Sequence, residues 1–417
     1  MKNKNEIIIN ELEELYKNPM LEELYKNPMF RISLGSKELF HSNFLAFLWD
    51  CDKQAKKAFL NMINDLLPEG KKINVSELLG KEGLTIYREK ENLDLCICHT
   101  ENNKDCNDII IENKVKSIPY IEQLDEYRQT AAKHQDKDST AVTYILLTLA
   151  KVFPNKEAIA KDWNIITYDQ LVKALTQYYH KNNIEPRLQQ YVADYTDFIY
   201  KLSALQIVDK FNDEPFHNPA IIEAYHKTKL SDLYLKQRGS YFICLLLNKI
   251  TKAQENNRLG KIEVKWGTKS QASGKNVVDN SKNAIIYLAS GMNRGKSTIT
   301  IHIYPKQCTS SYALQIEGNQ YRHMFIQSGL IAKRSTKVEQ YLNTMPFFAQ
   351  DQLPEPLQKD WQGRGDFNQY QPDCLYKYVT FEKTTGGQML DIVVEDIIKV
   401  LAYLPDCEPI AKKVSSL

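Results

Sequence analysis

Three short segments between residues 84 and 114 constrain the fold more than any other part of the sequence. They are "LTIYREK" (84–90), "NLDLCICH" (92–99) and "DIIIENK" (108–114), apolar runs separated by "EN" and by the polar stretch "TENNKDCN". Helical spacing precedes them at 35–50 and about 53–67 and follows them at 119–134, before a continuous apolar run at 141–150. This order of helix, three strands, helix and strand predicts an α/β core, a central mixed sheet flanked by helices.

Charged residues lie inside these apolar strands, where a pure core would exclude them. Asp94 interrupts "NLDLCIC", and Glu112 and Lys114 end "IIIENK". Two residues apart on a strand, Glu112 and Lys114 share a face. A buried charge is costly unless it is paired or bound to a metal. Carboxylates suit a hard divalent cation such as Mg²⁺, to which the backbone carbonyl of Asn113 can add an oxygen. A protonated lysine can orient or deprotonate a water, or neutralise charge on a phosphate.

Asp94 followed by Glu112-Asn-Lys114 on the next strand resembles the PD-(D/E)xK nuclease superfamily. Leu93 stands where the proline of the family motif would be. Gln123 and Tyr127, four residues apart on the following helix, match the Q-x-x-x-Y motif of RecB-like and lambda-exonuclease-like members. The resemblance covers about residues 31–150 and extends toward 206. It implies a restriction-endonuclease-like core.

The opening helix extends this resemblance. Glu38 and Ser42 in "KELFHSNFLAFLWD" match a bacterial family of the superfamily, in which a glutamate and a serine four residues later precede an apolar run. The resemblance implies a Mg²⁺-dependent nuclease, with Mn²⁺ able to substitute, that acts on DNA in restriction, repair or phage defence. RNA remains an alternative substrate. The alternative function is a nucleic-acid-binding or assembly module with weak or no cleavage.

The resemblance and the chemistry together imply a role for each site residue. Asp94 and Glu112 are expected to bind the metal, Lys114 to hold or activate the attacking water, and Gln123 and Tyr127 to line the site. Glu38 is expected to complete the metal shell, through a water.

Some neighbouring residues allow two interpretations. His41 is either a metal ligand or a packed helical histidine, and Glu89 is either part of the site or an ordinary surface acid. Lys116 is either a contact to the nucleic-acid phosphates or a solvated lysine at a strand end.

The second half of the chain is β-rich from about residue 258, with a helical segment before it. The segments "GKIEVKW", "NAIIYLAS", "STITIHIYP" and "SYALQIEG" resemble an antiparallel set. The stretch "SGMNRGKST" (290–298) resembles a phosphate-binding loop, but Ser290 stands where the first glycine belongs and a strand pattern follows. It therefore predicts a hairpin connection. Arg294 and Lys296 in it are either DNA-backbone contacts or solvated residues.

Composition excludes some classes of protein. A net charge of +2 across 417 residues gives no global basic signature, and no apolar run approaches the roughly 20 residues that span a bilayer. Together with the absence of a signal-peptide core, this predicts a cytoplasmic protein without a membrane partner. A homodimer is compatible with the sequence. The eight cysteines contain no C-x-x-C pair. The group Cys96, Cys98, His99 and Cys106 is either strand packing, which the alternation favours, or a metal site.

The sequence predicts four regions. They are an N-terminal helical segment with the tandem repeat "LEELYKNPM" (1–30), a nuclease-like domain (31–206), a helical connector (207–257) and a β-rich C-terminal domain (258–417).

Overall fold

The computed structural model divides the chain into two compact units. Unit 1 comprises Met1–Gln206 and Ala220–Gln237, and unit 2 comprises Ile207–Pro219 and Arg238–Leu417. The structure describes residues 19–33, 37–51, 53–133, 142–181, 185–205, 211–266, 283–306, 310–349, 367–370 and 372–402, with the single positions 357, 413, 414 and 416. The start of the tandem repeat lies outside the described residues. The four predicted regions stay a prediction.

Unit 1 is built on a five-stranded sheet with the order β1-β2-β3-β4-β5. The pairs β1–β2 and β2–β3 are antiparallel, whereas β3–β4 and β4–β5 are parallel. This mixed sheet confirms the predicted fold class. The strands are β1 (Thr85–Lys90), β2 (Leu93–Glu101), β3 (Lys104–Lys114), β4 (Thr143–Thr148) and β5 (Asn164–Thr167).

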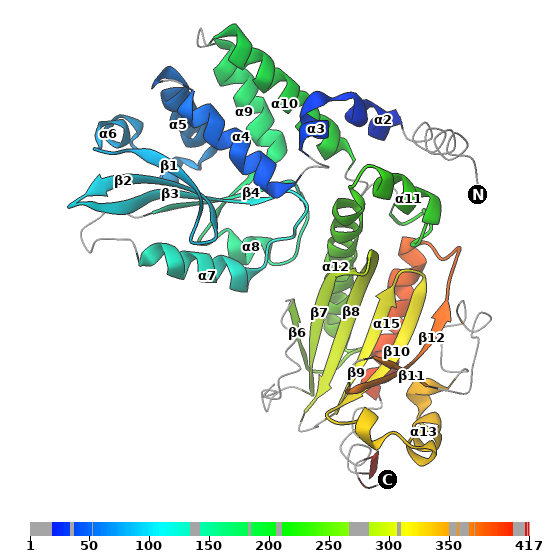
Figure 1. The fold of residues 1–417 in the computed structure, drawn as a ribbon. Helices are drawn as coiled ribbons and strands as arrows, with labels where there is room; N and C mark the ends of the chain where they lie inside the picture. The colour runs from blue at the N-terminus through cyan, green and yellow to red at the C-terminus, as the bar shows by residue number, and fades with distance from the viewer. Residues whose placement is uncertain are drawn as a thin grey trace. The chain divides into compact units, whose positions relative to one another are not determined.

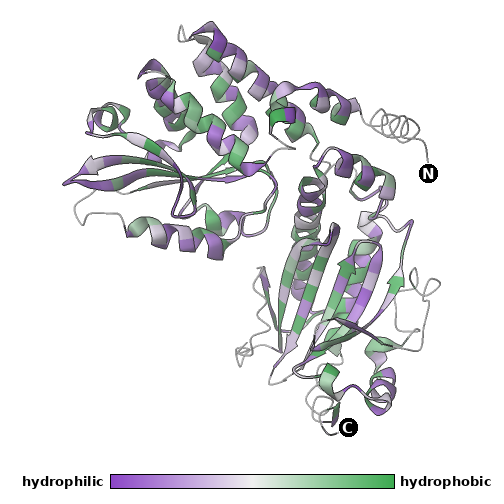
Figure 2. Ribbon diagram, viewed as in Figure 1, coloured by the Kyte–Doolittle hydropathy of each residue, from purple (hydrophilic) through white to green (hydrophobic). Residues whose placement is uncertain are grey.

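Helices cover both faces of this sheet (Figure 1). The long helices of unit 1 gather on the face opposite α7 and α8. The helices of this unit are α2 (Pro19–Lys26), α3 (Pro28–Ile32), α4 (Glu38–Asp50), α5 (Lys53–Leu66), η1 (Glu69–Lys71), α6 (Val75–Gly80), α7 (Ile121–Ala132), α8 (Lys156–Ile159), α9 (Tyr168–Lys181), α10 (Pro186–Ala204), α11 (Pro219–Lys227) and the first turns of α12 (Ser231–Glu255). Hydrophobic and hydrophilic residues are mixed along both the helices and the strands of this unit (Figure 2).

Strands β2 and β3 form a longer hairpin than the sequence predicts. The stretch "TENNKDCN", interpreted as a loop, continues both strands to a turn at Asn102 and Asn103. Both residues have positive φ, 50° and 61°, the conformation that a two-residue hairpin turn requires and that asparagine tolerates. The hairpin carries Asp94 near one end and His99 near the other.

The predicted helix over 219–254 is two helices in the structure. Helix α11 ends at Lys227 and α12 begins at Ser231. Lys229 between them has a φ of 59°, a left-handed conformation that no glycine or proline in the sequence announces.

Unit 2 contains a seven-stranded sheet with the order β11-β12-β10-β9-β8-β7-β6. Its strands are β6 (Ile262–Trp266), β7 (Ala284–Asn293), β8 (Lys296–Pro305), β9 (Ser310–Glu317), β10 (Gln320–Gln327), β11 (Asn368–Tyr370) and β12 (Cys374–Thr380). The other elements are the rest of α12, η2 (Ile331–Lys333), α13 (Thr336–Asn343), η3 (Pro346–Phe348) and α15 (Gly386–Ala402). Helices α12 and α15 lie along one face of this sheet (Figure 1).

Two sequence predictions for this sheet need correction. The first pair, β6–β7, is parallel rather than antiparallel. Strand β10 lies between β9 and β12 and was not predicted, because "QYRH" places polar residues where an apolar alternation would signal a strand.

Within the described part of the chain, the helices are too short or too polar to cross a membrane.

Candidate active site

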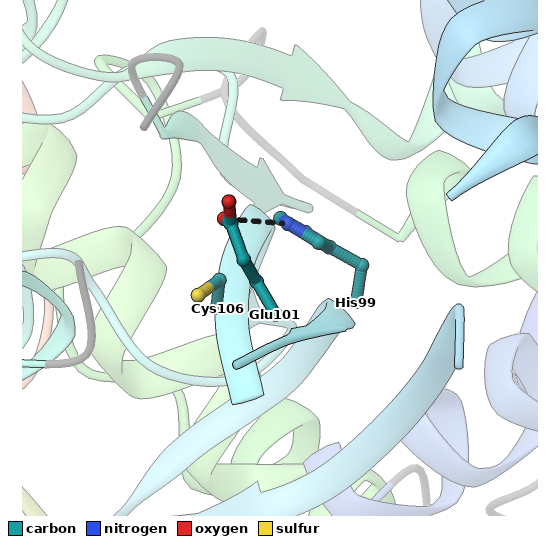
Figure 3. A group of neighbouring side chains, drawn as sticks. All are labelled: His99, Glu101 and Cys106. Atoms are coloured by element: carbon teal, nitrogen blue, oxygen red, sulfur yellow. Dashed lines mark ion pairs between the residues drawn. The ribbon is translucent and has the colours of Figure 1, made fainter. Parts of the chain in front are cut away.

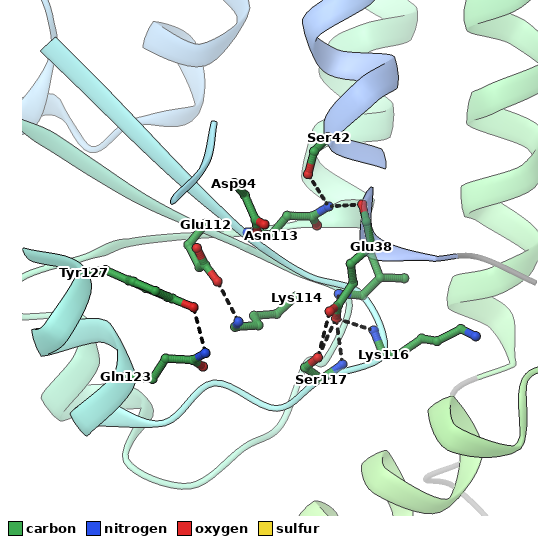
Figure 4. Close-up of polar contacts among 11 residues, drawn as sticks. Glu38, Ser42, Asp94, Glu112, Asn113, Lys114, Lys116, Ser117, Gln123 and Tyr127 are labelled. Atoms are coloured by element: carbon green, nitrogen blue, oxygen red, sulfur yellow. Dashed lines mark hydrogen bonds and ion pairs between the residues drawn. The ribbon is translucent and has the colours of Figure 1, made fainter. Parts of the chain in front are cut away.

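The register of β2 and β3 brings the strand-borne carboxylates together. Leu95 lies opposite Ile111, so Asp94 and Glu112 follow as the next cross-strand neighbours on one face. The backbone N–H of Asn113 donates to Asp94 Oδ2 at 2.7 Å. The predicted neighbourhood of Asp94 and Glu112 is therefore present (Figure 4).

The Glu112 carboxylate is buried, and only one of its two oxygens accepts a hydrogen bond from the part of the chain that the structure describes. Its side chain is 2% exposed, and Lys114 Nζ donates to Oε1 at 2.6 Å. Among the described residues, no donor lies within hydrogen-bonding distance of Oε2, the other oxygen. Burial raises the pKa of Glu112 to about 7, because burial and the charge of Asp94 outweigh the lowering effect of Lys114. A buried oxygen without a donor is costly unless another positive group binds it.

Asp94 shares this environment. Burial raises the pKa of its carboxyl to about 6, although the Asn113 amide and the Lys114 charge lower it. Two neighbouring carboxylates with raised pKa values favour the binding of a proton or a cation.

Lys114 is held as a cation beside Glu112. Burial alone lowers the pKa of the lysine, but the Glu112 carboxylate reverses this effect and the net pKa is raised. Its Nζ also lies 5.7 Å from the centroid of the Tyr127 ring, a cation–π distance. Gln123 Nε2 donates to Tyr127 Oη at 2.7 Å. The structure therefore places both residues of the Q-x-x-x-Y pair beside the triplet.

The Asn113 side chain links β3 to two helices. Its Nδ2 donates to the backbone oxygen of Glu38 at 3.1 Å and to Ser42 Oγ at 3.4 Å. Tyr168 Oη, on α9, donates to its Oδ1. These contacts anchor β3 to α4 and α9. A role for the Asn113 backbone carbonyl in metal binding stays a prediction.

Glu38 binds the chain that follows the triplet. Its Oε1 accepts from the backbone N–H groups of Val115, Lys116 and Ser117 at 2.9–3.0 Å and from Ser117 Oγ at 2.7 Å. The Ser117 hydroxyl also contacts Oε2. Glu38 thus fixes the loop after Lys114, and its predicted place in a metal shell stays a prediction. Ser117 was not identified from the sequence, because the contact joins residues far apart in the chain.

Lys116 lies in a different environment from the one predicted. Its side chain is buried, and Nζ donates to the backbone oxygen of Lys229 at 2.8 Å and pairs with Asp232 at 3.1 Å. Burial lowers the pKa of this lysine, and Asp232 only partly offsets it. A nucleic-acid contact would require these bonds to break. Neither Lys229 nor Asp232 belongs to a motif that can be recognised in the sequence.

His41 is packed in an aromatic cluster. It is fully buried, its Nδ1 lies 2.9 Å from Tyr195 Oη, and its ring stacks on Phe198. Burial lowers its pKa to about 3, which leaves the ring neutral. This geometry favours the packed-histidine interpretation.

Arg294 and Lys296 belong to unit 2. Arg294 lies in the turn between β7 and β8, where Arg294 and Gly295 have φ values of 49° and 76°, and Lys296 is the first residue of β8. Such a pair is typical of a two-residue hairpin turn. The predicted hairpin is confirmed, and both side chains are exposed. Their contact with DNA stays a prediction.

The comparison with known families agrees with the fold of unit 1. The sequence model of the PD-(D/E)XK nuclease superfamily matches residues 28–197, which contain Asp94, Glu112, Lys114 and the Q-x-x-x-Y pair. Neither the curated proteins nor the solved structures gave a match. The segment from residue 28 to residue 197 therefore belongs to the PD-(D/E)XK nuclease superfamily.

Proposed function

We propose that residues 31–206 form the catalytic domain of a Mg²⁺-dependent nuclease that hydrolyses phosphodiester bonds in DNA. One observation carries the proposal. Glu112 Oε2 is buried without a donor among the described residues, beside a second carboxylate and a buried ammonium. Nuclease activity is what the superfamily implies in general; DNA and Mg²⁺ are the proposed specifics.

The residues present fit a divalent metal. Asp94 and Glu112 offer hard oxygen ligands, and the Asn113 backbone carbonyl offers a further one. A cation at this position would satisfy Glu112 Oε2 and lower the pKa of both carboxyls. When bound, Mg²⁺ supplies Lewis acidity toward the scissile phosphate.

Four side chains of the site have separate roles in the proposed reaction. Lys114 is a cation in this arrangement, so we assign it to hold the attacking water and neutralise charge on the phosphate rather than to act as a general base. Tyr127 and Gln123 fix the position of the lysine. Glu38 fixes the backbone directly after it.

The alternative is a nucleic-acid-binding or assembly module with weak or no cleavage. The same acidic cluster would then serve only to hold β2 and β3 together. The biological setting, whether restriction, repair or phage defence, belongs to this proposal too.

The test is cleavage by purified protein of plasmid, linear duplex and single-stranded DNA and of RNA, with EDTA, Mg²⁺ or Mn²⁺. Asp94→Asn keeps an acceptor for the Asn113 amide but removes the charge, so folding should persist while cleavage falls by about 100-fold or more. Lys114→Met should act similarly. Glu89→Gln is the matched control, since Glu89 is exposed yet contributes to the field at Asp94. Its activity should stay within about threefold of wild type.

The outcomes separate the two functions. Equal cleavage by wild type, Asp94→Asn and Lys114→Met would refute the proposed site. DNA binding without metal-dependent cleavage in any preparation would establish the binding module instead.

A further inference from the structure

A second group of potential metal ligands lies at the turn end of the β2–β3 hairpin. His99 and Glu101 are two residues apart on β2, and Cys106 on β3 is the cross-strand neighbour of His99. The three side chains therefore share one face of the hairpin, and the His99 ring meets the Glu101 carboxylate (Figure 3). His99 and Cys106 are buried, whereas the Glu101 side chain is half exposed.

The donor atoms have spacings that a small cation can bridge. His99 Nε2 and Glu101 Oε2 are 3.5 Å apart, and both lie within 4.8 Å of Cys106 Sγ. Zinc bonds of about 2.0–2.1 Å to nitrogen and oxygen and about 2.3 Å to sulfur place tetrahedral donors about 3.3–3.6 Å apart. The His–Glu pair already has this spacing, and binding would require the Cys106 thiol, within 4.8 Å of both, to move closer.

A separate contact orients the histidine. Its Nδ1 lies 2.7 Å from Asp108 Oδ2, and Lys81 Nζ holds Asp108 Oδ1 at 2.6 Å. Nδ1–H donates a hydrogen bond to the carboxylate, which leaves Nε2 with the lone pair in the neutral ring. A histidine that binds a metal commonly donates its other N–H to a carboxylate in this way.

A β-bulge produces this arrangement. Ile97 pairs with Ile109 and Cys98 with Asn107, so Asp108 is the extra residue on β3. A bulge redirects the side chain of the unpaired residue. Here the side chain of Asp108 reaches His99, although Asp108 is not its cross-strand neighbour.

The group is distinct from the carboxylates of the proposed catalytic site. His99 is five positions after Asp94 on β2, about 16 Å along a strand, and this odd spacing places the two side chains on opposite faces. The donor types differ too. Imidazole and thiolate favour zinc and similar transition metals, whereas Mg²⁺ prefers oxygen.

We propose that His99, Glu101 and Cys106 bind one Zn²⁺ ion, with an open fourth position, and that Asp108 positions His99 for it. Binding replaces the Cys106 S–H bond with an S–Zn bond and releases the proton to solvent, so affinity rises with pH. The ion ties the turn ends of β2 and β3 together. The competing arrangement is a protonated His99 that bridges Asp108 and Glu101 without a metal.

The test uses the full-length protein after chelator treatment. Co²⁺ titration should give a thiolate-to-cobalt charge-transfer band that saturates at one equivalent, and Zn²⁺ should displace it. Cys106→Ser should abolish the band, and Glu101→Gln, at a half-exposed position, should weaken binding without unfolding. Asp108→Asn should weaken zinc binding by about 10-fold to 100-fold.

Matched controls identify the site. Cys51→Ser removes an exposed thiol on another element and should leave the band unchanged. Asp94→Asn should also leave it unchanged, so the result is independent of the proposed nuclease activity. Absence of the band in folded wild-type protein, or its persistence in folded Cys106→Ser, would overturn the proposal. If Cys106→Ser does not fold, retention of full zinc affinity by both Glu101→Gln and Asp108→Asn would overturn it.

Discussion

Each unit contains a buried carboxylate next to a buried basic group. Only one of these two carboxylates has a buried oxygen without a hydrogen-bond donor in the described part of the chain. In unit 2, Asp396 Oδ2 accepts from Tyr321 Oη at 2.7 Å and from His323 Nε2 at 2.9 Å, and His323 Nδ1 contacts the backbone oxygen of Phe347. No polar atom of these three side chains is buried without a partner. In unit 1, Glu112 keeps one oxygen without a donor among the described residues.

The difference distinguishes a structural network from a candidate site. A saturated buried network stabilises one arrangement and has no capacity for a ligand. An unsatisfied buried carboxylate costs stability in the absence of a ligand and recovers that cost on binding a cation. Burial of charge alone therefore does not separate Asp396 from Glu112; the oxygen without a donor in the described structure, beside a second carboxylate, distinguishes Glu112.

The largest expected effect on stability is at the saturated network. Asp396→Asn leaves His323 without its carboxylate partner, so we expect the free energy of unfolding to fall by about 3–5 kcal/mol. Thermal or denaturant unfolding measures it. Asp391→Asn, on the same helix but in an exposed ion pair with Lys249, should cost no more than about 1 kcal/mol. Similar losses in the two variants would contradict the assignment.

A smaller effect on stability is expected at Glu112, whose Oε2 has no donor among the residues described. Glu112→Gln keeps an acceptor for Lys114 but removes the charge, so we expect a loss of about 1–3 kcal/mol in the absence of metal. Adding Lys114→Met removes the buried ammonium as well and should restore part of that loss. A double-mutant cycle in denaturant measures the coupling. Additive losses would show that the two side chains act independently.

The two carboxylates of unit 1, Glu112 and Asp94, should also make the stability of the fold depend on pH. The pKa of Glu112 is raised from 4.5 to about 7 and that of Asp94 from 3.8 to about 6, so folding favours their protonated forms. Their contribution to stability is full below about pH 4 and is lost as pH rises through 6 and 7, because the folded state then gives up protons that it bound more tightly. Mg²⁺ should therefore raise the melting temperature more at pH 8 than at pH 5.

The same scan in Asp94→Asn provides the control. The variant should show a much smaller Mg²⁺ effect at either pH. An equal rise in melting temperature at pH 5 and pH 8 in wild type would argue against cation binding at these carboxylates.

The smallest effect is expected at the β7–β8 turn. Arg294→Ala and Lys296→Ala change exposed side chains, so the free energy of unfolding should move by no more than about 0.5 kcal/mol. If the turn contacts DNA, each variant should lower the slope of log affinity against log salt by about 1. Fluorescence anisotropy with a labelled duplex measures this slope. An unchanged slope would leave the turn as a solvated hairpin.

The sequence alone established the element order of the first unit and the likeness of its motif to a nuclease. Periodicity is a local property, so the strands of β1 to β3 and the hairpin at 294–295 followed from it. The acids within apolar strands were visible because such charges conflict with burial. The break between α11 and α12 at Lys229 was not predicted, and neither was strand β10. Neither feature has a local signal in the sequence.

Tertiary structure alone decided what each charged side chain contacts. Lys114 and Lys116 are only two residues apart in the chain, yet one pairs with Glu112 and the other with Asp232. Glu38 was predicted from its motif, but its carboxylate binds the backbone of residues 115–117. The bulge that turns Asp108 toward His99 is a register shift between strands, which no single strand encodes. Partner choice depends on packing between distant segments, and residue type and spacing do not specify it.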